Sequence, residues 1–439
     1  MFSFFEKLIK PFPSKEPDQP PKGVFAFCRH YSRGIEVPLL LMAILTATLA
    51  MLEVSLFSFM GELVEWLATK DKETFWAEEK GTLITMGIIV LIVLPSLVLL
   101  HAAIVHQTLL SNYPMVIRWL AHRYLLKQSL GFYQDEFAGR IATKVMQTSL
   151  AVRETVMKLL DVMVYVVVYF LSMLFIIAQA DVRLMVPLLI WLIMYIVLQY
   201  YFVPKLKAVS TVQADARSTM TGRIVDSYSN IATVKLFSHT QREADYAQQG
   251  MQGFLSTVYQ QMRLATGLNV SIQGLNYLLV FAIGALSIFL WQESAIGIGA
   301  ITIAITLALR LNGMAQWIMW EVSALFENIG TVVDGMKTLS QPLQVTDEEG
   351  ALPLVVEHGD IEFCKMNFSY AMADKQGVIS QKRIIKDLNL NIKAGEKVGL
   401  VGRSGAGKST LVNALMRFYD LESGSVKIDG QDISQVQQE

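Results

Sequence analysis

Six long apolar stretches constrain most strongly how this chain folds. Each is close to the ~20 residues that an α-helix needs to cross the hydrocarbon core of a bilayer. The stretches cover residues 37–60, 83–105, 156–178, 184–203, 268–291 and 300–320. Because backbone polar groups find no water inside a bilayer, spanning segments of this kind must be helical. The sequence therefore predicts a membrane region of six helices.

The composition agrees with this prediction and excludes other classes of protein. Apolar residues make up 53% of the chain, charged residues make up 17%, and the mean hydropathy is +0.41. Such values are too apolar for an ordinary soluble protein. The net charge of −1 gives no support for nucleic-acid binding. Residues 1–12 place phenylalanines and an isoleucine at helical spacing, which indicates either a helix lying in the membrane interface or a frayed tail.

The basic residues predict the orientation of the chain. Lys and Arg are concentrated before the first stretch and in two long loops, residues 111–155 and 204–266, whereas the loop after the first stretch is mainly acidic. The positive-inside rule places the basic loops in the cytoplasm. We expect a multi-pass protein of the cell membrane with both termini cytoplasmic. The two long loops contain many helix formers, so we expect helices that continue out of the membrane and return.

A glycine-rich motif near the end of the chain predicts a phosphate-binding loop. Residues 402–409 read Gly-Arg-Ser-Gly-Ala-Gly-Lys-Ser and match G-x-x-x-x-G-K-[ST]. Lys397–Val401 is expected to be a short buried strand before the loop, and Lys408–Phe418 a helix after it. In this arrangement backbone N–H groups surround phosphate oxygens, Lys408 reaches the β- and γ-phosphates, and the Ser409 hydroxyl holds magnesium. The alternative is a glycine-rich turn with a chance lysine.

These features together resemble an ATP-binding cassette (ABC) exporter of the bacterial half-transporter type, in which six spans and a nucleotide-binding domain share one chain. The resemblance is most specific over residues 361–433. Ile361-Glu362-Phe363 and Asn367-Phe368-Ser369-Tyr370 resemble the family's first strand and its adenine-stacking aromatic, which falls on Tyr370. The alternative for Tyr370 is a tyrosine packed in a sheet. An extra stretch, Met372 to Gln381, departs from the family pattern.

The resemblance implies a mixed fold class and four segments. An all-α transmembrane domain of six helices with long cytoplasmic helical extensions precedes an incomplete α/β P-loop nucleotide-binding domain. The expected segments are an N-terminal cytoplasmic segment with a Pro-rich linker (1–34), a type-1 transmembrane domain (35–334), a linker (335–356) and the N-terminal part of the nucleotide-binding domain (357–439). In the family, short coupling helices sit at the tips of the two long loops, here expected near Phe132–Phe137 and Tyr228–Thr233.

The motif and the resemblance imply ATP and Mg²⁺ as cofactors, with Ser409 as the magnesium ligand. The expected nucleotide-binding residues are Tyr370, Gly402, Ser404, Gly405, Ala406, Gly407, Lys408, Ser409 and Thr410.

The catalytic half of the family's nucleotide-binding domain has no counterpart in the sequence. A glutamine loop, an LSGGQ-like signature, an Asp-Glu pair after a strand and a switch histidine do not occur between Thr410 and Glu439. The Asp-Glu pair would orient magnesium and polarise the attacking water. We therefore expect a chain truncated within this domain and assign no catalytic residue. Because the missing part would supply parallel neighbours for Lys397–Val401, we expect the segment after Val355 to be poorly stable alone.

Three of the spans carry candidate ionisable residues: Glu53, His101 and Arg310. Charges at membrane depth normally face the interior of a helix bundle or a water-filled path, so Arg310 with Asn312 is the predicted substrate pathway. The alternative is that these side chains snorkel or pair with each other. A pair between Glu53 and Arg310 is left open, because their depths differ by ~10 Å when counted along the helices.

The sequence thus predicts ATP-driven export of an amphipathic or lipid-like substrate by a homodimer or heterodimer of half-transporters. The expected partners are a second half-transporter, membrane lipid and the transported substrate, and no nucleic acid. The alternative is a membrane protein that binds nucleotide without hydrolysing it, or a remnant without transport. The sequence determines neither the substrate nor which kind of dimer forms.

Overall fold

The computed structural model describes residues 2–135, 138–237, 240–348, 350–373 and 379–438. The chain divides into two compact units. Unit 1 contains residues 1–8, 34–110 and 154–328, and unit 2 contains residues 9–33, 111–153 and 329–439.

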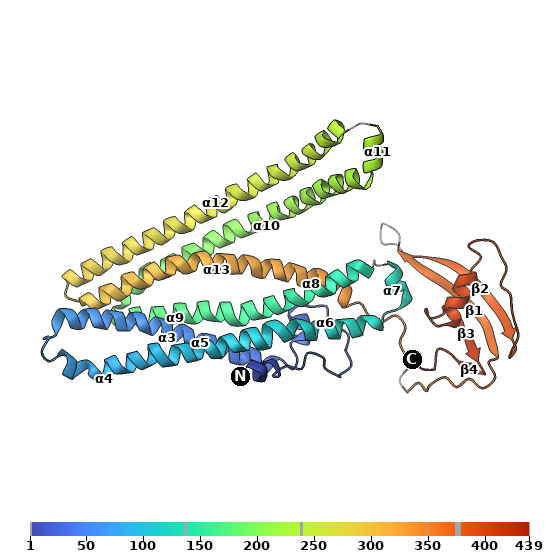
Figure 1. Ribbon diagram of the computed structural model, residues 1–439, viewed down its shortest axis with the longest axis horizontal. Coiled ribbons are helices and arrows are strands. Elements are labelled where there is room, and N and C mark those ends of the chain that lie inside the picture. The colour runs from blue at the N-terminus through green and yellow to red at the C-terminus, as the bar shows by residue number, and fades with distance from the viewer. Residues whose placement is uncertain (1, 136–137, 238–239, 349, 374–378, 439) are drawn as a thin grey trace. The chain divides into compact units, whose positions relative to one another are not determined.

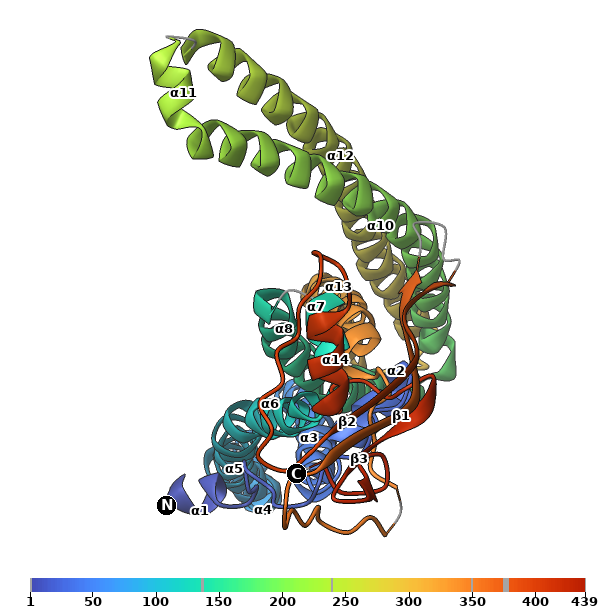
Figure 2. The ribbon, with the colours of Figure 1, turned by 90° about the vertical axis from the view of Figure 1, so that its right-hand side faces the viewer.

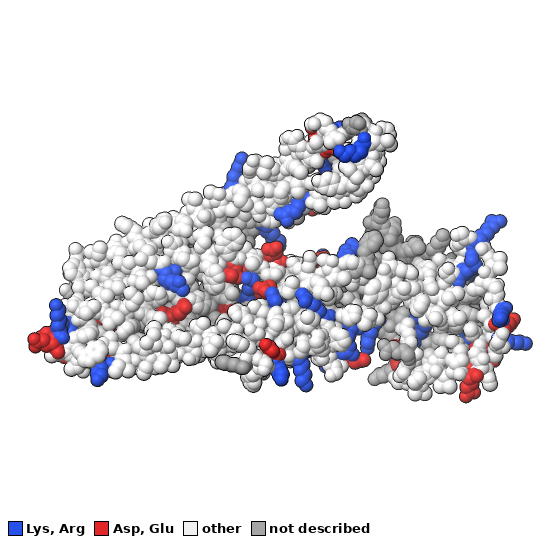
Figure 3. Space-filling view, viewed as in Figure 1, with Lys and Arg blue, Asp and Glu red and all other residues white. Residues whose placement is uncertain are grey.

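Six long helical segments make up most of the described chain (Figure 1). They run over Glu36–Thr69, Phe75–Leu126, Gly139–Ala180, Val182–Ser229, Thr240–Gln292 and Ile298–Leu339. Each is long and apolar enough to cross a membrane, and each contains one of the six predicted stretches, which confirms that prediction. Figure 3 shows few charged side chains over much of the helical surface that faces the viewer. Both long loops are continuations of these helices, as expected.

Two of the six segments contain π-helical turns. The first segment is α3 (Glu36–Thr69), the fifth is α12 (Thr240–Gln292) and the sixth is α13 (Ile298–Leu339). The second consists of α4 (Phe75–Ile88), η1 (Ile89–Val93), α5 (Leu94–Ala103), η2 (Ile104–Leu110) and α6 (Ser111–Leu126). The third consists of α8 (Ala138–Met157), η3 (Lys158–Val162) and α9 (Met163–Ala180), and the fourth of η4 (Val182–Leu184) and α10 (Met185–Ser229). The turns η1, η2 and η3 are π-helical and η4 is a 3₁₀ turn.

Short helices occupy the tips of both long loops. In unit 2, α7 (Leu130–Asp135) lies between α6 and α8. In unit 1, α10 and α12 run side by side and α11 (Ile231–Leu236) joins them at their far end (Figure 1). The predicted tips near Phe132–Phe137 and Tyr228–Thr233 fall on or beside these helices. Phe137 itself lies outside the described residues.

The core of unit 1 lies among α3, α9, α10, α12 and α13 and is strongly apolar. It includes stacked aromatic rings, since Trp191 stacks on Tyr195 with 5.2 Å between ring centroids. The Trp191 indole donates a hydrogen bond to Asn276 Oδ1 at 2.9 Å, and Asn276 Nδ2 donates to Asn312 Oδ1 at 2.9 Å. This chain of hydrogen bonds satisfies polar groups that would otherwise be costly within an apolar core.

Unit 2 contains a four-stranded antiparallel sheet. Its strands are β1 (Ile361–Ala373), β2 (Ile379–Ile392), β3 (Ser423–Ile428) and β4 (Gln431–Asp432), in the order β2-β1-β3-β4. Helix α14 (Lys408–Leu415) covers one face of the sheet (Figure 2), where Ala414 packs with the apolar residues of β1. The extra stretch Met372–Gln381 extends the β1–β2 ladder at both of its described ends, since Met372 pairs with Ser380 and Ala371 with Gln381.

Two local predictions around the phosphate loop are wrong. Lys397–Val401 forms no strand, and Val401 is 97% exposed. A parallel strand needs hydrogen-bonding neighbours, and no described strand pairs with this segment. The helix expected to reach Phe418 ends at Leu415, because Arg417 adopts a left-handed backbone with φ of 50°.

The N-terminal segment contains two short helices. Helix α1 (Phe2–Glu6) has a single turn and ends before Phe12. Phe5 and Ile9 are buried, whereas Phe12 is exposed, so only part of the predicted apolar face is covered. A second helix, α2 (Val24–Tyr31), follows the Pro-rich stretch. The start of the expected linker, residues 335–339, belongs to α13.

Candidate functional site

The predicted phosphate loop connects the segment after β2 to α14. Lys408, the first residue of α14, folds back over the loop, and its Nζ donates hydrogen bonds to the carbonyl oxygens of Gly402 at 2.8 Å and Arg403 at 3.0 Å. Gly405 and Gly407 have φ of 82° and 87°, a left-handed conformation that glycine adopts without steric cost. The sequence therefore places glycine at two positions where the turn of the loop requires it.

Most of the expected phosphate-loop residues are accessible. Residues 402–406 and Ser409 are exposed, and Gly407 caps the N-terminus of α14. The first N–H groups of a helix lack partners within the helix and carry partial positive charge, so they attract anions. Thr410 instead is 7% exposed and faces the sheet. It therefore packs α14 against the sheet and is not free to contact a phosphate with its side chain. A phosphate group fits this combination of N–H donors, one ammonium and one hydroxyl.

Tyr370 lies on β1 beside α14. Its hydroxyl oxygen is 3.4 Å from Thr410 Oγ1. Its ring meets Phe368 and Tyr419 edge to face, with centroid distances of 4.8 and 5.2 Å. The structure thus brings Tyr370 next to the helix that follows the loop, and its partly buried ring packs within the sheet in the way that the alternative describes.

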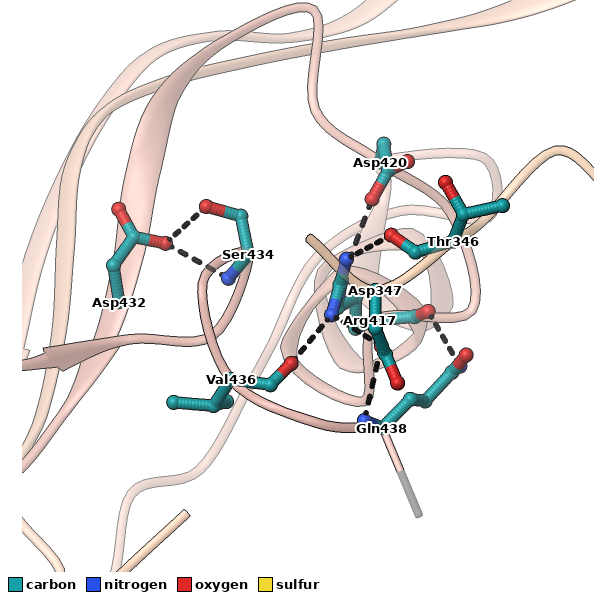
Figure 4. A network of polar contacts seen from close by, with 8 residues as sticks. All are labelled: Thr346, Asp347, Arg417, Asp420, Asp432, Ser434, Val436 and Gln438. Carbon is teal, nitrogen blue, oxygen red and sulfur yellow. Dashed lines mark hydrogen bonds and ion pairs between the residues drawn. The ribbon is translucent and has the colours of Figure 1, made fainter. Parts of the chain in front are cut away.

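A buried arginine fixes the chain after α14, and the sequence did not indicate this role. Arg417 is 6% exposed and makes an ion pair with Asp347 at 3.2 Å (Figure 4). Its guanidinium also donates to the carbonyl oxygens of Thr346 and Val436, both at 2.9 Å. One side chain therefore joins the end of α14 to the linker and to the segment after β4. The only sequence signal is the basic side chain itself, in the run Arg417-Phe418-Tyr419-Asp420 after α14.

The tip helix α7 contacts the same region of unit 2. Tyr419 Oη donates a hydrogen bond to Gln134 Oε1 at 2.8 Å. Gly131 lies so close to this tyrosine that a Cβ atom there would be 3.1 Å from its ring. The loop tip predicted to dock on the nucleotide-binding segment thus contacts the residues that follow α14.

A second candidate site lies among the membrane helices of unit 1. Thr46 of α3, His101 of α5 and Asp161 of η3 form a polar cluster. Thr46 Oγ1 lies 3.0 Å from His101 Nε2, which lies 3.2 Å from Asp161 Oδ1, and the Thr46 hydroxyl donates a hydrogen bond to Asp161. Of these three residues, the sequence indicated only His101. Asp161 was detectable, because it is an ionisable residue inside the third apolar stretch.

Glu53 and Arg310 form an ion pair, a possibility that the sequence left open. Their closest atoms, Arg310 Nη2 and Glu53 Oε2, are 3.8 Å apart, and the Tyr165 hydroxyl donates to Glu53. The backbone N–H of Gly299 donates to Glu65 Oε2 at 2.7 Å and sets the register of α3 against α13. From that contact the two residues lie about 18 and about 17 Å along their helices, at the same level. The expected depth difference arose because α3 continues to Thr69.

Both clusters line one cavity of about 590 Å³. The cavity is bounded by Thr46, Leu49, Glu53, Leu56, Leu94, Val98, His101, Asp161, Val162, Tyr165, Arg310, Gly313, Met314 and Trp317. Its volume is that of a site for a drug-sized molecule. Arg310 is therefore on the cavity wall, whereas Asn312 is not among the lining residues and accepts a hydrogen bond from Asn276.

Matches to known proteins cover most of the chain. Residues 39–314 match the family described as ABC transporter transmembrane region, and residues 385–439 match the family described as ABC transporter. The chain is 48% identical over 441 residues to an uncharacterized ABC transporter ATP-binding protein of Haemophilus influenzae, covering 100% of this chain and 70% of that protein.

More distant relatives share parts of the chain or its fold. The beta-(1-->2)glucan export ATP-binding/permease protein NdvA of Agrobacterium vitis is 27% identical over 265 residues, which cover 58% of this chain and 42% of that protein. The solved structure of a bacterial Atm1-family ABC exporter with ATP bound superposes with a TM-score of 0.68 at 19% identity. That match covers 93% of this chain and 70% of the exporter, and it shows a common fold.

Proposed function

Since this chain belongs to the ABC transporter family, we propose that it is a half-transporter component of an ATP-driven exporter. The six membrane helices supply the translocation pathway, and the segment around α14 binds the triphosphate of ATP. The observation that carries this proposal is the phosphate loop, whose left-handed glycines and folded-back lysine adjoin a helix N-terminus.

Different residues around the loop contact different parts of ATP. Backbone N–H groups of residues 404–410 contact phosphate oxygens, and Lys408 exchanges its two carbonyl partners for phosphate. Ser409 holds Mg²⁺, which neutralises phosphate charge. The Tyr370 ring packs against adenine and presents a flat apolar surface to the base.

The transported substrate is amphipathic or lipid-like, because the lining of the membrane cavity combines apolar side chains with charged groups. The six helices pair with those of a second half-transporter, identical or different. Residues 35–334 serve as the transmembrane domain, residues 335–356 as a linker and residues 357–439 as the nucleotide-binding part. Both termini lie in the cytoplasm, where ATP is available. Binding of ATP reaches the membrane helices through α7, which contacts Tyr419.

A second candidate function is nucleotide binding without hydrolysis. It is favoured by the segment before the phosphate loop, because Lys397–Val401 is exposed and paired with none of the described strands. Hydrolysis depends on positioning of the phosphoryl group to a fraction of an ångström, which an unsupported loop does not provide.

Fluorescent trinitrophenyl-ATP titrated into the full chain in detergent, with and without Mg²⁺, tests nucleotide binding. Lys408→Ala is expected to weaken binding by about tenfold to hundredfold, since a charge-assisted contact to phosphate is lost. Lys393→Ala, an exposed lysine outside the loop, is the matched control and should bind as the unmodified chain does. Equal affinity of the two variants would overturn the proposed site. Phosphate release measured in the same samples separates the exporter ATPase from the non-hydrolysing alternative.

A further inference from the structure

The cavity of unit 1 has an apolar wall with charged groups at two levels. Its wall includes aliphatic side chains from α3, α5 and η3 and the aromatic rings of Tyr165 and Trp317. The Thr46 cluster and the Glu53 cluster lie seven residues apart along α3, or about 10 Å at the rise of an α-helix. A molecule inside the cavity therefore meets apolar surface and ionised groups together.

The charges of the side chains that line the cavity do not cancel. Glu53 is compensated by Arg310 and by the Tyr165 hydroxyl. Among the described residues, Asp161 forms hydrogen bonds with Thr46 and His101, and both are uncharged while the imidazole is neutral. With neutral His101, the side chains that line the cavity carry one negative charge in excess. An uncompensated carboxylate in an apolar cavity strongly favours a bound cation.

The backbone around this carboxylate is unusual. Asp161 belongs to the π-helical turn η3, and His101 lies in the α-helical turn between the π-helical segments η1 and η2. A π-turn re-aims side chains relative to a regular α-helix, and such turns occur frequently at functional sites. Asp161 and His101 thus meet across two helical segments that both depart from regular geometry beside the cavity.

We propose that this cavity binds an amphiphilic organic cation and that protonation of His101 releases it. The ammonium or phosphonium centre of the ligand lies at Asp161, and its apolar body lies against the aliphatic wall and the rings of Tyr165 and Trp317. Aromatic faces also attract cations, which adds to the preference for positive charge. The inference rests on the proposed function, because it names the chemical class of the exported substrate.

The direction of the pH effect follows from the charges. The ionisable groups that share the cavity with His101 are Asp161, Glu53, Tyr165 and Arg310. Histidine gains its proton between about pH 5 and 8 in proteins. An imidazolium next to Asp161 compensates the excess negative charge and repels a second cation. Binding is therefore strong while the imidazole is neutral and weak when it is protonated.

Radiolabelled tetraphenylphosphonium tests the proposal, since its positive charge does not change with pH. Equilibrium binding to the full chain in lipid nanodiscs is measured between about pH 5 and 8, the range in which histidine titrates. Saturable binding should weaken by about tenfold or more towards the acid end, because a desolvated charge pair is lost. Asp161→Asn should weaken binding at high pH by a similar factor. His101→Gln retains a hydrogen-bond donor and should bind with little dependence on pH.

Glu293→Gln is the matched control, because this carboxylate pairs with Arg183 and does not line the cavity. It should reproduce the unmodified curve, and size-exclusion profiles establish that each variant is folded. Absence of saturable binding at high pH in the folded unmodified chain would overturn the proposal. So would Asp161→Asn binding as tightly as Glu293→Gln, or tetraphenylborate, an anion of the same shape, binding as well as the cation.

Failure of this inference differs from failure of the proposed function. A chain that binds trinitrophenyl-ATP through Lys408 but no tetraphenylphosphonium remains an ABC exporter component with a different substrate class. A chain that binds the cation with the expected pH dependence but no nucleotide retains the cavity site and loses the proposed ATP site.

Discussion

Asp429 shows how one carboxylate organises backbone at the scale of a residue. Its two oxygens accept hydrogen bonds from the backbone N–H groups of residues 357–360, the turn that precedes β1. These donors stabilise the ionised carboxylate, so they hold the pKa of Asp429 well below its usual range. The turn before β1 is therefore fixed by a contact with a residue of the β3–β4 connection, some 70 positions later in the chain.

This contact predicts a dependence of local stability on pH. Because the folded-state pKa is depressed, the stabilisation is complete above the unfolded value of about 3.9 and is lost as pH falls through the folded value. Asp429→Asn should increase hydrogen exchange of residues 355–365 at neutral pH, and the difference from the unmodified chain should shrink below about pH 4. Asp432→Asn is the control, because the Asp432 carboxylate accepts a hydrogen bond from the backbone N–H of Ser434 and not from the turn before β1. Equal exchange of both variants at neutral pH would contradict the role of Asp429.

Gly299 shows how one missing side chain permits helix packing. A Cβ atom at this position would lie 2.4 Å from the carbonyl oxygen of Gly61, so α3 and α13 approach each other closely here. Gly299→Ala should force the helices apart and lower stability by about 1–3 kcal/mol, a typical cost of overpacking. Thermal unfolding in detergent measures the effect. Gly330→Ala in the same helix meets nothing within 4 Å and should be neutral or slightly stabilising; similar losses in both would refute the packing argument.

At the scale of elements, strands depend on partners more than helices do. The membrane helices satisfy their own backbone groups, and their apolar runs alone located them. The strand expected at Lys397–Val401 needs neighbours on both sides, and in the described residues its backbone groups are left to solvent. The extended β1–β2 ladder shows the reverse case, since pairing there includes residues 371–373 and 379–381 that the sequence pattern did not mark as strand.

Hydrogen exchange tests directly whether residues 397–401 of unit 2 form a strand. Backbone amides of residues 397–401 should exchange close to the rate of an unstructured peptide, because Val398, Leu400 and Val401 are all exposed. Residues around Val426 of β3, which is fully buried, should be protected in the same sample and serve as the internal control. Strong protection across 397–401 would show that the segment is a stable strand after all.

At the scale of the whole molecule, the unequal distribution of basic residues predicts sidedness. In a background of Cys28→Ala and Cys364→Ser, Asp71→Cys places a thiol in the loop after α3, and Lys235→Cys places one on α11. Because Lys and Arg are retained in the cytoplasm, an impermeant maleimide should label the first variant in intact cells and the second only after permeabilisation. The opposite labelling pattern would invert the proposed topology.

The sequence by itself determined the six membrane helices and the location of the phosphate loop. Both are local: an apolar run of about 20 residues decides where a helix crosses, and the loop takes its shape from glycines at fixed spacing. Tertiary structure decided which polar groups meet. Thr46, His101 and Asp161 come from three helical segments, and Arg417 finds Asp347 at a separation of 70 residues. Those contacts depend on helix register and chain path, which no run of neighbouring residues records.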